Sequence, residues 1–193
     1  MQFKRCSING IAYLEKDGKL YELNESGSDV TEPPVDLMDC PEEMELFLLA
    51  LTLCHTVQVH EATENEDLHY SAASPDEKAL VEAMKRLNLV FVNDEDEMIV
   101  IEIFGQSKIF RKLEILEFTS GIGKFMIRFP LSMNININFG VITDRKRMSV
   151  IIEDEEGVIT LYCKGAESAV IPQVTEGPSD ETLKHVADFA MVR

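Results

Sequence analysis

The sequence predicts an α+β fold, an antiparallel β-sheet flanked by helices, and two observations lead to this expectation. Strand-like segments occur in neighbouring pairs joined by short turns, and helical segments are grouped between them instead of alternating one by one with strands. At 193 residues and 45% hydrophobic content, the chain is large enough for a substantial core. We expect one domain over residues 1–193, with an atypical insertion at 121–143.

The first elements are predicted to be strands. Residues 8–15 and 19–23 have the composition of a β-hairpin, with Lys16, Asp17 and Gly18 supplying the turn. Residues 25–34 are rich in Ser, Gly, Asp and Pro, which is typical of a connecting loop.

Two helices are expected next, separated by an acidic loop at residues 61–67. The first begins at Pro41 with two glutamates and continues to about His55; it is apolar on most sides, which predicts burial. The second begins at Ser74, an N-cap residue followed by proline, and ends near Leu87. Glu77 lies three residues after the cap, so the pair forms a capping box.

The remaining strand segments share β-branched and aromatic residues and lie at 89–92, 98–104, 108–118, 148–153 and 157–163. The first three predict an antiparallel meander, and the last two predict a hairpin. Short helices are expected after Gly165 and after Ser179.

Composition excludes several classes of partner. The formal charge of −17 argues against nucleic acid or an anionic membrane surface as a partner. The longest apolar run, Leu46 to Leu53, is far shorter than the roughly 20 residues of a membrane-spanning helix. The four cysteines have neither zinc-site spacing nor a dense disulfide pattern, so we expect a reducing cytosolic setting and no metal site.

Residues Ser74 to Val81 read S-P-D-E-K-A-L-V and closely resemble the nucleotide-binding domain of P-type ATPases, in the form typical of the type IV branch, the phospholipid flippases. Further matches follow in the family's order, at Phe3 to Tyr13, Leu53 to Val57, Leu116 to Ser120, Asp144 to Val150 and Lys164 to Ala166. The resemblance covers nearly the whole chain.

The resemblance implies an ATP site. Phe118 matches the aromatic on which adenine stacks, Glu77 the carboxylate that accepts from the adenine amino group, and Lys164 the pocket lysine. Gly165 would let the backbone approach the ligand. Without the family, the same residues suit a core aromatic, a helix cap and a solvated lysine with a helix-entry glycine.

By the same resemblance, Thr119, Ser120, Arg145 and Lys146 line the phosphate side of the site. Taken alone, the D-R-K-R run is a solvated turn. Magnesium would arrive with the nucleotide, since no carboxylate cage for it is evident.

Three departures from the family pattern are visible. The D-K-T-G-T-L-T motif, with its phosphorylated aspartate, does not occur, so we expect no catalytic residue here and no acyl phosphate formed by these 193 residues. The family's G-L-R-T segment, with a further pocket arginine, is also absent. Residues Gly121 to Thr143 interrupt a stretch that is contiguous in the family and contain no acidic residue. They suit either an extended hairpin or a translated intron foreign to the fold.

These observations predict the cytosolic nucleotide-binding domain, or a fragment carrying it, of a phospholipid-translocating P-type ATPase. Its partners would be ATP, the phosphorylation and actuator domains of the parent protein, and through that parent a membrane with its phospholipid substrate. The alternatives are the equivalent domain of another P-type cation pump and a degenerate interaction module without a ligand.

Overall fold

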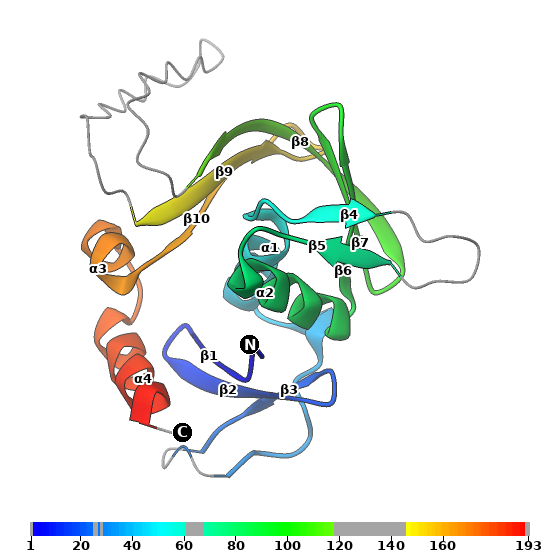
Figure 1. Cartoon of the computed structure of the whole chain (residues 1–193). Helices are drawn as coiled ribbons and strands as arrows, with labels where there is room; N and C mark the ends of the chain where they lie inside the picture. Colours follow the sequence, from blue (N-terminus) through cyan, green and yellow to red (C-terminus); the bar gives the residue numbers. More distant parts are fainter. Residues whose placement is uncertain (1, 25–26, 28, 61–67, 118–145, 192–193) are drawn as a thin grey trace.

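A five-stranded antiparallel sheet forms the largest layer of the protein (Figure 1). The computed structural model describes residues 2–24, 27, 29–60, 68–117 and 146–191. The strands run in the order β10-β9-β8-β7-β6 and comprise β6 Leu89–Glu95, β7 Met98–Ile103, β8 Gln106–Leu116, β9 Arg147–Glu153 and β10 Ile159–Gly165. Every neighbouring pair is antiparallel, as the short turns require.

Two helices form the middle layer, α1 (Glu42–Leu53) and α2 (Pro75–Arg86). They lie inside the curve of the large sheet, and a second sheet lies on their other side (Figure 1). That sheet has three strands, β1 Arg5–Ile8, β2 Ile11–Lys16 and β3 Lys19–Glu22. The arrangement buries apolar side chains on two sides of the helix pair.

Each side of the helix layer has its own hydrophobic core. Towards the large sheet, Leu49 and Leu53 of α1 belong to a cluster with Phe91 and Ile101. Towards the small sheet, the cluster contains Met44, Leu48 and Met84 of the helices and Cys6, Ile8, Tyr13 and Leu20 of the strands. Met84 and Ile101 are completely buried. Apolar residues on several sides of α1 are thus explained, because the helix faces both cores.

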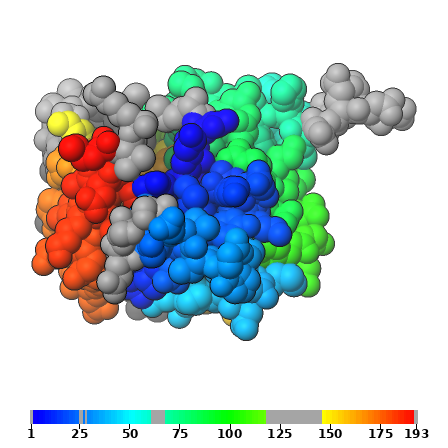
Figure 2. Space-filling view, turned by 90° about the horizontal axis from the view of Figure 1, so that it is seen from below, coloured from blue at the N-terminus to red at the C-terminus, as the bar shows by residue number. Residues whose placement is uncertain are grey.

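The remaining elements lie at the margins. A short 3₁₀-helix, η1 (Leu37–Asp39), precedes α1, and a two-stranded hairpin, β4 (Gln58–His60) with β5 (His69–Ser71), follows it. After β10 come α3 (Glu167–Val170), a second 3₁₀-helix, η2 (Ile171–Gln173), and α4 (Ser179–Met191). The last helix packs beside β1, as seen from below in Figure 2.

The predicted α+β class with helices flanking an antiparallel sheet is confirmed. The meander, the β9–β10 hairpin and the helices α1 and α2 are also present. The helix expected to be short after Ser179 is α4, which at 13 residues is longer than α1 or α2. Ser74 caps α2 as expected, since its Oγ accepts a hydrogen bond from the Glu77 N–H at 3.4 Å.

Some predicted boundaries were wrong. Residues 8–15 are not one strand, because Asn9 and Gly10 adopt positive φ values of 47° and 78° and form a turn between β1 and β2. Asn-Gly is the preferred pair for such a turn. Helix α1 ends at Leu53 and not at His55, and Leu46 on its outer side is 41% exposed. The β4–β5 hairpin was not predicted.

The proposed insertion at 121–143 and the acidic loop at 61–67 lie outside the described residues. The division into one domain with an insertion therefore stays a prediction. Among the residues that are described, no helix is long and apolar enough to cross a membrane.

Candidate nucleotide-binding site

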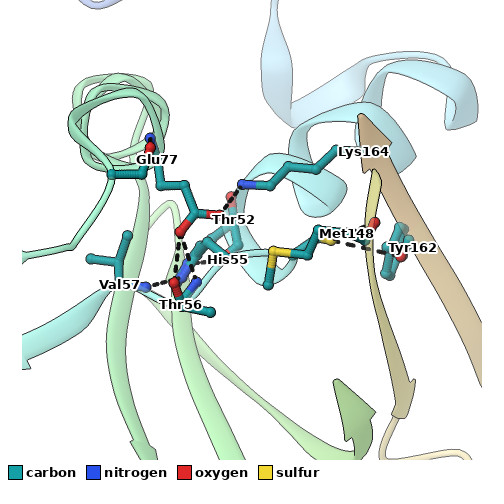
Figure 3. Close-up of polar contacts among 10 residues, drawn as sticks. Thr52, His55, Thr56, Val57, Glu77, Met148, Tyr162 and Lys164 are labelled. Atoms are coloured by element: carbon teal, nitrogen blue, oxygen red, sulfur yellow. Dashed lines mark hydrogen bonds and ion pairs between the residues drawn. The ribbon is translucent and has the colours of Figure 1, made fainter. Parts of the chain in front are cut away.

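Glu77 is the centre of a polar cluster at the N-terminal end of α2. It lies in the first helical turn, where a carboxylate is favoured by the helix dipole, yet it is only 8% exposed. Its carboxylate does not return to the cap as the capping box predicted. It points away from the cap, towards the segment after α1 and towards β10 (Figure 3).

Thr56, just after α1, holds one oxygen of this carboxylate. The Thr56 hydroxyl donates to Glu77 Oε2 at 2.7 Å, and the Thr56 backbone N–H donates to the same oxygen at 3.3 Å (Figure 3). Hydrogen bonds to an ionised acceptor are among the stronger ones in proteins. The carboxylate is therefore fixed through Oε2 while Oε1 faces elsewhere.

Lys164, near the end of β10, reaches the other oxygen. Its Nζ lies 3.0 Å from Glu77 Oε1, and the two side chains are 15% and 10% exposed. Burial by itself would raise the pKa of Glu77, but the hydrogen bonds from Thr56 and the ammonium of Lys164 outweigh it and hold that pKa below its usual value. Glu77 is thus ionised at neutral pH, and the pair carries no net charge.

His55 stiffens the segment that carries Thr56. Its Nδ1 accepts from the Val57 N–H at 3.2 Å, so Nε2 carries the proton and donates to the Thr52 carbonyl at 2.8 Å. The ring meets Phe91 edge to face, with centroids 4.4 Å apart. Burial, and then the charge of Lys164, lower the pKa of His55 to about 4, so the imidazole is neutral.

Cys54 joins the same segment to the large sheet. Its Sγ lies 3.7 Å from the carbonyl oxygens of Met148 on β9 and of Tyr162 on β10. Burial raises the pKa of this thiol to about 11, so it is neither a thiolate nor a ready metal ligand. Nowhere in the described part of the chain do three His, Cys, Asp or Glu side chains gather as a metal site would require.

The strand register brings distant parts of the chain to one edge of the large sheet. Leu116 at the end of β8 pairs with Ser149, and Lys164 on β10 pairs with Met148. Lys146 comes just before β9, and its carbonyl accepts from the Ala166 N–H at 2.9 Å. The end of β8, the start of β9 and the end of β10 therefore lie together.

Of the predicted site residues, the structure brings Glu77, Lys146, Lys164 and Gly165 to this end of the molecule; the side chain of Lys146 is exposed there. The others lie outside the described residues: Phe118, Thr119, Ser120 and Arg145.

Comparison with known proteins identifies the family of the chain. The chain is 34% identical to human phospholipid-transporting ATPase IG over 99% of its length and 33% identical to phospholipid-transporting ATPase IC of Xenopus tropicalis over 98%. It is 32% identical to a phospholipid-transporting ATPase of Schizosaccharomyces pombe, again over 98%. The chain belongs to the type IV P-type ATPases. It spans about 15% of the length of these relatives. No protein-family model matches it.

Gly165 has a structural role in this ATPase segment. A Cβ at this position would lie 2.5 Å from the Lys146 carbonyl oxygen and 2.5 Å from Arg147 Cβ, because β9 and β10 approach closely at their paired ends. Arg147 in turn donates to the Ala169 carbonyl at 3.0 Å and so anchors α3 beside the site. The missing side chain is explained by strand pairing before any ligand is considered.

Thr56 and His55 were not predicted as site residues. Both belong to the L-C-H-T-V stretch that resembles the P-type ATPase family, but the stretch itself indicates no role. A hydrogen-bonding residue directly after a predicted helix end was the available signal, and Glu77, the partner of Thr56, lies 21 residues further along the chain. Only the packing of α1 against α2 shows that Thr56 and Glu77 meet.

Proposed function

We propose that the chain is an ATP-binding domain of a phospholipid-translocating P-type ATPase, and that the pair of Glu77, which is buried, and Lys164, which is partly buried, marks its nucleotide site. The pair is the observation that carries the proposal, because it puts an acceptor and a cation side by side at the sheet edge where Lys146 also lies. The carboxylate suits the amino group of adenine, and the ammonium suits a phosphate.

Charge supports the same assignment. The chain carries a formal charge of −17, so a polyanion such as ATP requires local cations. Lys164 and Lys146 supply positive charge at this edge, and Arg145, from the sequence, would add to it. In the described structure Lys164 is already paired with Glu77, so ATP must compete with an internal carboxylate. We therefore expect weak binding, with a Kd on the order of 0.1 to several mM.

In this proposal the domain contributes positioning. It holds ATP and presents the γ-phosphate to an aspartate on another domain of the parent protein, because phosphoryl transfer depends mainly on alignment and charge stabilisation. Magnesium would be bound mainly by the nucleotide phosphates. The parent would lie in a membrane, with this domain on the cytosolic side and a phospholipid as the transported substrate.

The test is a titration of the chain with MgATP, followed by backbone amide NMR shifts. We expect shifts at Thr56, Glu77 and Lys164, and a Kd raised about tenfold by Lys164→Ala. Phe118→Ala should weaken binding by a similar factor if this aromatic stacks on adenine.

Lys78→Ala is the matched control, because Lys78 neighbours Glu77 in sequence and forms an exposed pair with Glu82 on the surface of α2. It should leave the Kd unchanged. Shifts that cluster away from Glu77 and Lys164, or no saturable shift at all, would favour an interaction module without a nucleotide.

A further inference from the structure

The way in which Glu77 is held divides its two oxygens between two roles. Oε2 receives both contacts from Thr56, one from the hydroxyl and one from the backbone N–H. Oε1 receives the ammonium of Lys164, from a different strand. If the phosphate of a ligand attracted Lys164 away from Glu77, the two Thr56 contacts would remain. The carboxylate would then keep its orientation, with Oε1 open to a hydrogen-bond donor on the ligand.

We infer that Thr56 is a positioning residue for base selection: it fixes the Glu77 carboxylate so that Oε1 accepts a hydrogen bond from an amino group on the purine. This inference rests on the proposed nucleotide function and adds a specificity determinant to it. Thr56 acts through Glu77 and need not touch the base.

Chemistry makes the selection directional. An ionised carboxylate is acceptor-only, so it bonds the 6-amino group of adenine but repels the 6-oxo group of hypoxanthine or guanine. Discrimination depends on an orientation held during binding, because a free carboxylate can rotate away from the oxo group. The pKa of Glu77 is held below its usual value by the Thr56 hydrogen bonds as well as by Lys164, and the Thr56 share of this stabilisation of the ionised form, the first condition, remains when Lys164 moves away.

The setting of Thr56 meets the second condition. The segment around it is held by His55, whose two ring nitrogens both bond backbone groups, and by Cys54 against the large sheet. Thr56 itself is exposed, although its contact with Glu77 is partly buried. An exposed residue on a rigid segment fits the rim of a ligand site better than a purely structural role.

The first experiment needs no nucleotide. Carboxylate carbon NMR follows the titration of Glu77 in the 193-residue chain, in Thr56→Val and in Thr56→Ser. Valine keeps the shape and the backbone N–H but removes the hydroxyl, so the pKa of Glu77 should rise, whereas serine should keep it near the original value. Thr31→Val, which removes an exposed hydroxyl bonded to the Glu22 carbonyl, is the control. An unchanged titration in Thr56→Val overturns the positioning role.

The second experiment compares ATP with ITP, which replaces the 6-amino group by an oxo group. The original chain should prefer ATP by about tenfold, and Thr56→Val should reduce the preference to roughly twofold while Thr56→Ser retains it. Equal weakening of both nucleotides by Thr56→Val would show a merely structural role and overturn the inference. Equal affinities in the original chain would overturn it while the proposed function stands, and no binding of either nucleotide would overturn both.

Discussion

The two ends of α2 carry carboxylate–cation pairs of similar chemistry in different surroundings. At the first turn, Glu77 pairs with Lys164 and accepts a backbone N–H from Thr56. At the last turn, Arg86 contacts Glu15 through two nitrogens, at 3.0 and 3.2 Å, and Glu15 also accepts the Gly18 N–H. In each pair a cation and a loop N–H hold one carboxylate.

The difference lies in what each pair joins. Arg86 is 41% exposed and fastens α2 to the turn between β2 and β3, where the backbone of Gly18 approaches the Arg86 carbonyl. Lys164 is only 15% exposed and meets Glu77 at the sheet edge beside Lys146. The carboxylates of the two pairs are shielded alike, since Glu15 is 8% and Glu77 10% exposed, and the difference lies in the cation. The first pair has a structural explanation that needs no ligand, whereas the second also holds its cation largely away from water. The exposure of the cation and the elements that each pair joins, more than the residue types, distinguish the structural pair of Arg86 and Glu15 from the candidate site at Glu77 and Lys164.

The largest expected effects come from the glycines beside the two pairs. A Cβ on Gly18 would lie 2.6 Å from the Arg86 carbonyl oxygen, and the residue has φ +70°. Gly18→Ala should therefore cost about 4 kcal/mol of stability, from backbone strain and overpacking together. Gly165 does not have a positive φ, so Gly165→Ala causes overpacking without backbone strain and should cost about 3 kcal/mol. Urea unfolding measures both.

Gly157→Ala is the control for these variants, because Gly157 has φ +81° but a Cβ added there would have nothing within 4 Å. It should cost only about 1 to 2 kcal/mol. If Gly18→Ala cost no more than Gly157→Ala, the close approach of the β2–β3 turn to α2 would be wrong.

Acid should destabilise the protein through His55, which lies just after α1 beside the candidate site. The unfolded imidazole takes up a proton below pH 6.5, whereas the folded one does so only near pH 4, so the folded state loses stability as the pH falls through this window. The loss amounts to roughly 3 kcal/mol. The lowered pKa of Glu77 acts in the same direction. Urea unfolding between pH 7 and 4, with the His55 ring followed by NMR, checks this; an imidazole that titrates near 6.5 would contradict it.

Smaller effects separate the two ion pairs. Lys164→Ala leaves the poorly exposed carboxylate of Glu77 with Thr56 as its partner among the described residues and should cost about 1 to 2 kcal/mol. Arg86→Ala, at the more exposed pair, should cost about 0.5 to 1 kcal/mol and leave nucleotide binding unchanged. Equal losses of nucleotide affinity in the two variants would remove the distinction between the candidate site and the structural pair of Arg86 and Glu15. Chemical unfolding and the MgATP titration provide the two measurements.

Local patterns predicted the elements whose formation depends on neighbouring residues. Helix α2 has its cap, its first-turn proline and its apolar spacing close together in the sequence, and the structure matches them from Ser74 to Leu87. The β4–β5 hairpin escaped prediction because strands of three residues show too little alternation. The turn at Asn9 and Gly10 was visible as a pair, and the apolar residues on both sides masked it as a continuous strand.

By itself, the sequence determined the α+β class, the helices α1 and α2, the meander and the membership in the type IV P-type ATPases, because periodicity, turn residues and motif order can be read along the chain. Only the tertiary structure decided which groups the Glu77 carboxylate contacts. Its position predicted a cap to its own helix, but Thr56 and Lys164 come from other elements and offer stronger donors to a carboxylate shielded from water. Contacts between elements far apart in the chain depend on how those elements pack, and this packing cannot be predicted from the spacing of residues within one element.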